Sequence, residues 1–248
     1  MSLYLFHEGE VTEKLVYRAW IQHALPGLRE VESAPEITRG TFFLFAGGGF
    51  PAYEPALDNC ARDVRDNPAI EHLLVCIDTD DRPPADVRRA QVEARVEQAI
   101  TSAGMREGNP SVQVHVVVQH WCIETWFLGH AKLSLRATHT PRLQKLMAHF
   151  DVRAYDPEAM RLPAWTDRDT ARTTHGFHQQ YLSELFQNVV PRTRYAKSKP
   201  GIVLSRDYYD ALVERVAVTG HLPSLAHLFE TLRRVGSPPP RASEAMDG

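Results

Sequence analysis

Three carboxylates in the sequence directly follow apolar runs that are typical of strands. Glu8 comes after residues 3–7 (LYLFH), and Asp78 and Asp80 come after residues 71–77, which end in a continuous apolar run. Because ligands of open parallel sheets collect at the carboxyl ends of the strands, we expect these carboxylates to meet at one edge. Carboxylate oxygens are the ligands that Mg²⁺ prefers, and a bound Mg²⁺ can polarise a phosphodiester. The pattern therefore predicts a magnesium site for phosphodiester chemistry.

Each of these residues also has an ordinary structural interpretation. The segment Asp78-Thr79-Asp80-Asp81 precedes two prolines and is also typical of a turn that caps the next helix. Glu8 would then be a surface turn residue. The presence of acidic residues at two strand ends favours the metal site over two unrelated turns.

Three further residues are candidates for catalytic roles beside this site. Glu13 lies in the first turn of a predicted helix, where it could reach the same metal or simply favour the helix N-terminus. Glu124 lies among apolar and aromatic residues, so it either faces the acidic edge or caps its own helix, because an unpaired buried charge is costly. Lys197 lies in a basic segment, where it could neutralise the scissile phosphate or belong to a solvated loop.

Other motifs carry little functional signal. His175 and His178 are spaced to share a helix face, but no Cys or acidic partner is evident, so we do not expect them to bind a metal. The glycines at 47–49 match neither a dinucleotide fingerprint nor a P-loop. The three cysteines are far apart, which predicts neither a disulfide framework nor a structural zinc site and fits a reducing cytoplasm.

Strands and helices are predicted to alternate through the first half of the chain. Apolar runs and turn signals place strands at residues 3–7, 41–46, 71–77 and 112–118, and helices at 11–25, 54–65, 84–104 and 123–128. This order predicts an α/β fold with a mainly parallel, four-stranded sheet flanked by helices on both faces. The second half lacks strand signals, and helices are expected around residues 141–150, 176–187, 205–217 and 223–235.

The chain is therefore predicted to have three parts. Residues 1–130 are expected to form the metal-binding α/β domain, residues 131–236 a helical C-terminal extension that is basic, and residues 237–248 a disordered tail. The whole chain has 248 residues, 43% of them hydrophobic and 24% charged, which are ordinary values for a globular protein.

Charge is unevenly distributed along the chain. Residues 131–206 hold 13 Lys and Arg against 6 Asp and Glu, a net charge of +7, whereas the rest of the chain has a net charge of −10. A basic part beside an acidic one suits a polyanionic substrate, so we expect the basic residues to border the acidic edge. The alternative is a chance segregation of solvated charge.

The sequence carries no signal for a membrane or for export. No apolar run approaches the roughly 18 residues that span a bilayer. The N-terminal MSLYLFHEGE has no basic region before its short apolar stretch, which indicates a first strand rather than a signal peptide. We expect a cytoplasmic protein that has no membrane partner.

The motifs together resemble the TOPRIM family. TOPRIM domains carry a Glu-Gly at the end of the first strand and an Asp-x-Asp at the end of a later one, as in Glu8-Gly9 and Asp78-Thr79-Asp80. The fuller pattern is similar to small TOPRIM-like proteins of bacterial defence systems, related to the overcoming-lysogenization-defect (OLD) nucleases. Its other matches are Glu13, the Gly-rich stretch 47–53, Ile123-Glu124-Thr125-Trp126 and Tyr195-Ala196-Lys197. The resemblance covers about residues 3–130, and the late Tyr-Ala-Lys match is loose.

The resemblance implies cleavage of DNA or RNA that depends on Mg²⁺ or Mn²⁺. Metals would bind Glu8, Asp78 and Asp80, with Glu13 or Glu124 completing a second position, while Lys197 stabilises developing charge. It also implies a role in phage defence and an ATPase as partner protein. One departure is that Asp81-Arg82-Pro83-Pro84 follows the motif where TOPRIM proteins often have Gly, which argues against close kinship to primases or topoisomerases.

Two other functions stay open. The chain could be a TOPRIM-like module that binds nucleic acid or a partner protein without catalysis. It could also hydrolyse a small phosphate ester, although the Asp-x-Asp motif of such enzymes normally closes the first strand, and here it closes the third predicted one. The sequence leaves the oligomeric state open, a homo-oligomer included.

Overall fold

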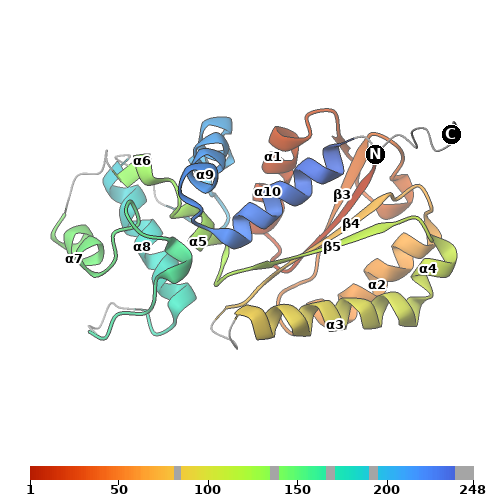
Figure 1. Ribbon diagram of the computed structural model, residues 1–248, viewed down its shortest axis with the longest axis horizontal. Helices are drawn as coiled ribbons and strands as arrows, with labels where there is room; N and C mark the ends of the chain where they lie inside the picture. The colour runs from red at the N-terminus through yellow and green to blue at the C-terminus, as the bar shows by residue number, and fades with distance from the viewer. Residues whose placement is uncertain (81–84, 135–139, 166–170, 190–194, 238–248) are drawn as a thin grey trace, which may run out of the picture.

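The computed structural model describes residues 1–80, 85–134, 140–165, 171–189 and 195–237 (Figure 1). The sheet strands are β1 (Leu3–His7), β2 (Arg29–Glu30), β3 (Thr41–Ala46), β4 (His72–Asp78) and β5 (Gln113–Gln119). The helices are α1 (Thr12–Ala24), α2 (Tyr53–Asp66), α3 (Ala85–Ala103), α4 (Met105–Gly108), α5 (Ile123–Phe127), α6 (Ala131–Ser134), α7 (Pro141–His149), α8 (Thr174–Val189), α9 (Arg206–Thr219) and α10 (Pro223–Gly236). Short 3-10 turns cover Ala34–Glu36, Pro157–Ala159 and Gly201–Leu204.

The strands form one all-parallel sheet in the order β2-β3-β1-β4-β5. The predicted α/β class, the parallel sheet, the flanking helices and the C-terminal helices are confirmed. The predicted number of four strands is wrong, because β2 adds a fifth. This strand is only Arg29–Glu30, too short and too polar to produce an apolar or alternating pattern.

Side chains alternate along the central strand and feed two separate cores. Leu3 and Leu5 of β1 pack in the core under α1 and α10, whereas Tyr4 and Phe6 pack in the core under α2 and α3. Figure 1 shows the two pairs of helices on opposite faces of the sheet. Because β1 and β4 are buried on both faces, their sequences are continuously apolar rather than alternating.

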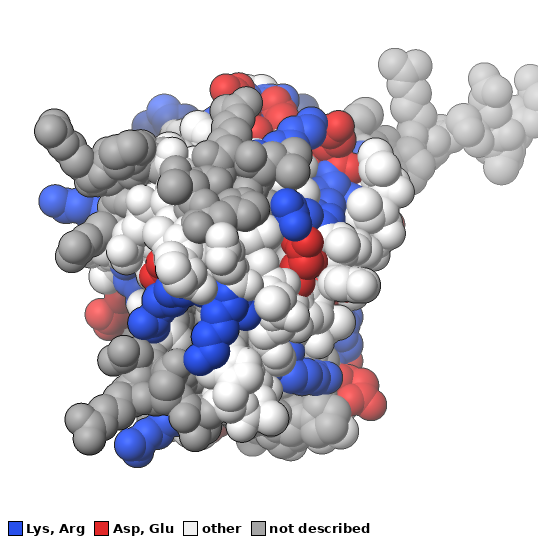
Figure 2. Space-filling view, turned by 90° about the vertical axis from the view of Figure 1, so that its left-hand side faces the viewer, with Lys and Arg blue, Asp and Glu red and all other residues white. Residues whose placement is uncertain are grey.

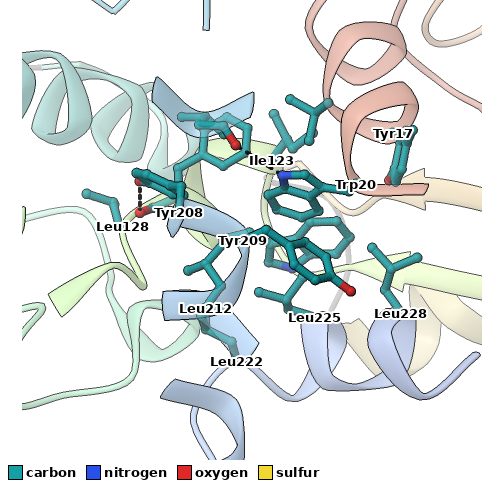
Figure 3. Close-up of a cluster of buried hydrophobic side chains, with 14 of the residues drawn as sticks. Tyr17, Trp20, Ile123, Leu128, Tyr208, Tyr209, Leu212, Leu222, Leu225 and Leu228 are labelled. Atoms are coloured by element: carbon teal, nitrogen blue, oxygen red, sulfur yellow. Dashed lines mark hydrogen bonds between the residues drawn. The ribbon is translucent and has the colours of Figure 1, made fainter. Parts of the chain in front are cut away.

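The core under α1 continues without a break into the helical second half of the chain. Figure 3 shows Trp20 of α1 packed among side chains of α9 and α10, and the Trp20 indole donates a hydrogen bond of 3.1 Å to the carbonyl of Val203. The hydroxyl of Tyr208 donates to the carbonyl of Phe127 at 2.6 Å. The two predicted parts of the chain therefore share one apolar cluster, and their division into domains stays a prediction.

Two sequence predictions concern membrane spans and the C-terminal tail. In the part of the chain that the structure describes, no helix is both long and apolar enough to cross a membrane. The predicted tail, apart from Ser237, lies outside the described residues, as does the segment 81–84 that departs from the TOPRIM pattern.

Candidate metal centre

Glu8 is held at the carboxyl end of β1 between the ends of the two neighbouring strands. Its amide donates to the carbonyl of Cys76 on β4 at 3.2 Å, and its carbonyl accepts from the amide of Gly49, just past β3, at 2.8 Å. Glu8 is 7% exposed. These backbone bonds fix the residue at the sheet edge, independently of what its carboxylate binds.

The Asp78-Thr79-Asp80 segment is tied to the end of β5. The amide of Thr79 donates to the carbonyl of Gln119 at 3.0 Å, and the amide of Asp80 donates to the carbonyl of Trp121 at 2.8 Å. The Thr79 hydroxyl in turn accepts from the amide of Trp121 at 2.7 Å. Asp80 adopts a left-handed backbone with φ of 46°, a conformation that Asp tolerates better than most residues other than glycine. The pairing with Trp121 holds it in this conformation.

Glu8, Asp78 and Asp80 converge as predicted. Each offers a carboxylate oxygen, and these oxygens lie within 4.8 Å of one another. Asp78 Oδ1 is buried and has no hydrogen-bond partner among the described residues. Burial raises the pKa of Asp78 well above its usual value, and the carboxylates of Glu8 and Asp80 raise it further. An all-oxygen donor set with an unsatisfied buried oxygen fits a hard divalent cation, so this cluster could hold a metal.

Glu13 lies beside the same cluster. A Cβ atom on Gly9 would overlap the carboxylate of Glu13, so the glycine after Glu8 leaves the space that this carboxylate occupies. Burial raises the pKa of Glu13, a hydrogen bond to its own backbone amide lowers it, and the charge of Glu124 raises it again. Asp80 and Lys197 also act on this group. Glu13 is therefore close to the other candidate residues.

Glu124 is the second residue of α5 and is 1% exposed. The hydroxyl of Tyr195 donates to Glu124 Oε1 at 2.8 Å, and Lys197 Nζ lies 3.9 Å from the same oxygen. The carbonyl of Lys197 accepts from the Thr12 hydroxyl at 2.7 Å, which attaches the segment around Lys197 to the start of α1. The structure thus brings the late Tyr-Ala-Lys segment to the acidic edge.

The charge of the cluster acts on Lys197. Partial burial lowers the pKa of Lys197, but the carboxylates of Glu124, Glu13 and Asp78 outweigh it, and the pKa is raised overall. The ammonium therefore stays charged. Among the described residues, the carboxylates of Glu8, Glu13, Asp78, Asp80 and Glu124 gather near this lysine, and a divalent cation would relieve the repulsion among them.

The two histidines separate into different roles. Both ring nitrogens of buried His178 make hydrogen bonds, one with the Thr125 hydroxyl at 2.8 Å and one with the Met160 carbonyl at 3.1 Å. His178 is therefore a core residue that connects α8 to α5. His175 Nδ1 lies 3.9 Å from Asp80 Oδ1, at the rim of the acidic cluster.

Two residues at this edge escaped the sequence analysis. Tyr195 was noted only as part of a loose motif, yet it donates to Glu124. No motif in the sequence singles out Arg88 of α3, yet it is 6% exposed and donates to the Tyr53 hydroxyl at 2.8 Å. Its position four residues before Val92, in the apolar stripe of α3, was a signal that could have identified it.

The predicted basic border is only partly visible. Figure 2 shows the end of the molecule formed by the helical half, where Lys and Arg side chains are interspersed with Asp and Glu. The described part of this face therefore carries both positively and negatively charged side chains. Among the basic residues of 131–206, Lys197 is placed at the acidic edge by its contact with Glu124, and a wider basic border stays a prediction.

Comparisons with known proteins identify no relative. No family model matches the chain, and neither a curated protein nor a solved structure matches it.

Proposed function

We propose that this chain is a TOPRIM-type nuclease that hydrolyses phosphodiester bonds of DNA or RNA with Mg²⁺ or Mn²⁺. The observation that carries the proposal is the convergence of Glu8, Asp78 and Asp80, whose oxygens lie within 4.8 Å of one another at the carboxyl edge of the sheet. The Lys197 ammonium, 3.9 Å from Glu124, supports it, because a cation beside the reacting phosphate stabilises the charge that develops during phosphodiester cleavage.

The roles of the residues follow from their positions. Glu8, Asp78 and Asp80 would hold the cation, and Glu13 or Glu124 would complete a second position. The cation supplies positive charge that polarises the phosphodiester and favours attack by water. Lys197 keeps its proton at Nζ and stabilises the charge that develops on the phosphate oxygens. Tyr195 fixes the carboxylate of Glu124 through its hydrogen bond.

The test is cleavage of plasmid DNA, single-stranded oligonucleotides and tRNA in Mg²⁺ and in Mn²⁺. We expect wild-type protein to cleave at least one class and Asp78→Asn to lose this activity. Glu93→Gln, which removes one negative charge from the exposed side of α3, is the matched control and should cleave normally. Calorimetric titration with Mn²⁺ on the same variants reports whether the acidic cluster binds metal at all.

The possible results separate the candidate functions. Metal binding without cleavage of any substrate would favour the module that binds nucleic acid or a partner protein. Absence of metal binding in wild-type protein would refute the proposed site. The phage-defence role and the ATPase partner rest on the family resemblance alone, and co-purification with an ATPase encoded beside this protein would test them.

A further inference from the structure

Arg88 occupies a position in α3 that the sequence pattern assigns to the core. Val92 and Val96 of the same stripe pack on the sheet, each at most 3% exposed. Arg88 lies one turn nearer the start of α3, which is the end that follows the Asp78-Thr79-Asp80 segment. The inner face of α3 therefore passes from the sheet to the region beyond the carboxyl ends of the strands, and Arg88 is the residue it presents there.

The Arg88 guanidinium is buried, and the described residues give it no direct ion pair. Within the described residues it donates one hydrogen bond, to the Tyr53 hydroxyl at 2.8 Å, and its Cζ lies 5.9 Å from the centroid of the Tyr53 ring, while its Nε is buried without a hydrogen-bond partner. No carboxylate in the described part of the chain lies at ion-pair distance from it. Buried arginines are normally paired with an anion, because an isolated buried charge is costly. Arg88 therefore has room for an anionic partner that the described residues do not supply.

Backbone bonds connect this guanidinium to the metal centre. The amide of Tyr53 donates to the carbonyl of Gly49 at 2.9 Å, and the amide of Gly49 donates to the carbonyl of Glu8 at 2.8 Å. Burial raises the pKa of the Tyr53 hydroxyl, Arg88 lowers it and the Glu8 carboxylate raises it, so all three groups are close. Arg88 is thus linked to Glu8 through the Tyr53 hydroxyl and the backbone of Tyr53 and Gly49.

Arg88 and Lys197 approach the acidic cluster from different faces of the sheet. Tyr53 and α3 belong to the core under α2 and α3, whereas the Lys197 segment is attached to α1 and faces α5. Two cations on different sides of the acidic cluster suit a ligand that carries several phosphates better than a single phosphate ester. It therefore bears on the class of substrate.

We propose that Arg88, held in place by Tyr53, binds a backbone phosphate next to the cleaved one and thereby selects polynucleotides over small phosphate esters. The proposal rests on the proposed function for the kind of ligand. Binding of the neighbouring phosphate would draw the strand across the edge from Arg88 to Lys197. The guanidinium would then gain the anionic partner that the described residues do not provide.

The experiment measures binding separately from cleavage. Fluorescence anisotropy of a labelled single-stranded oligonucleotide is recorded in Ca²⁺, over a series of salt concentrations. We expect Arg88→Gln to raise Kd by about 10-fold to 100-fold, the usual effect of losing one charge-assisted hydrogen-bonded contact. The slope of log K against log salt should fall by about 0.7, the value for one phosphate contact with a single strand. Arg89→Gln, the same change at the adjacent half-buried position, is the control and should retain wild-type binding.

Further variants exclude a purely structural role. Arg88→Lys keeps the charge but lacks the fork of donors, so it should bind more weakly than wild type and more strongly than Arg88→Gln. Tyr53→Phe removes the bond that orients the guanidinium and should weaken binding in the same direction. If Arg88→Gln fails to fold, the oligonucleotide Kd values of Arg88→Lys and Tyr53→Phe test the proposal in its place. Lower melting temperatures with unchanged oligonucleotide binding would overturn the proposal.

Failure of this proposal and failure of the proposed nuclease function are distinguishable. If wild-type protein binds the oligonucleotide but does not cleave it in Mg²⁺ or Mn²⁺, the nuclease function is refuted. The effect of Arg88→Gln on Kd would still test the role of Arg88. Cleavage that is insensitive to Arg88→Gln would refute only the role of Arg88. Wild-type protein that binds no oligonucleotide would overturn the Arg88 proposal outright.

Discussion

Replacement of Asp78 by Asn separates a metal ligand from a structural turn residue. Two unit charges no more than 4.8 Å apart repel by about 3 kcal/mol or more at an effective dielectric constant of about 20. Glu8, Asp78 and Asp80 therefore destabilise the metal-free protein, and protonation of Asp78 relieves only part of this. Asn has the shape of the protonated side chain and carries no charge. We expect Asp78→Asn to melt at the wild-type temperature or above it when metal is absent.

The same substitution should remove the response to metal. Free Mg²⁺ at about 100 times its Kd stabilises the folded state by about 2.7 kcal/mol. For a chain of this size that corresponds to a rise in melting temperature of about 5–10 °C. Wild-type protein and Glu93→Gln should show this rise in differential scanning fluorimetry, and Asp78→Asn should show little of it.

Two results together would refute the role of Asp78 as a metal ligand. One is a metal-free melting temperature of Asp78→Asn several degrees below that of wild type. The other is a wild-type melting temperature that Mg²⁺ does not change. Asp78 would then stabilise the turn after β4 through hydrogen bonds of its charged form, and the acidic cluster would have no cation to hold.

Three other substitutions test separate parts of the structure. Gly9→Ala should displace the carboxylate of Glu13 and lower turnover more than stability, which cleavage rates and thermal melts on one preparation would show. Tyr195→Phe leaves buried Glu124 without its 2.8 Å donor and should cost about 1–3 kcal/mol in urea unfolding, and an unchanged midpoint would contradict this. Burial raises the pKa of Glu158 from 4.5 to about 7, so its contribution to stability is present below pH 4.5 and lost as the pH rises through 7. Wild-type protein should lose up to about 3 kcal/mol relative to Glu158→Gln between about pH 5 and pH 8, and parallel profiles would refute this.

The elements of the fold were predictable where burial dictates the residue pattern. β1 and β4 are buried on both faces, and their apolar runs located them to within one residue. The carboxylates that follow them were predictable for the same reason, because a parallel sheet places all its carboxyl ends on one edge. β2 could not be found this way, since its two residues, Arg29 and Glu30, are not part of either core.

The partners of the site residues were harder to predict than the residues themselves. The hydrogen bond from Tyr195 to Glu124 joins residues 71 positions apart, and local periodicity carries no information on such a contact. For Arg88, the position could be predicted from the sequence but the burial could not. Its position in the stripe of Val92 was readable, but an arginine there is compatible with a solvent-exposed helix start until the structure shows that it is 6% exposed.

The shared apolar cluster of α1, α9 and α10 has a consequence for biosynthesis. Glu8 and Asp78 are translated long before α10 (Pro223–Gly236), the helix that packs with α1 on one face of the sheet. A nascent chain that has not reached residue 223 has both acidic strand ends but leaves apolar side chains such as Trp20 without part of their cover. Domains generally fold as units during synthesis, and the cluster shared by α1, α9 and α10 joins both halves of this chain. We therefore expect ribosome-bound chains shorter than this to remain sensitive to protease and inactive, so that the acidic edge becomes ordered only when α10 docks.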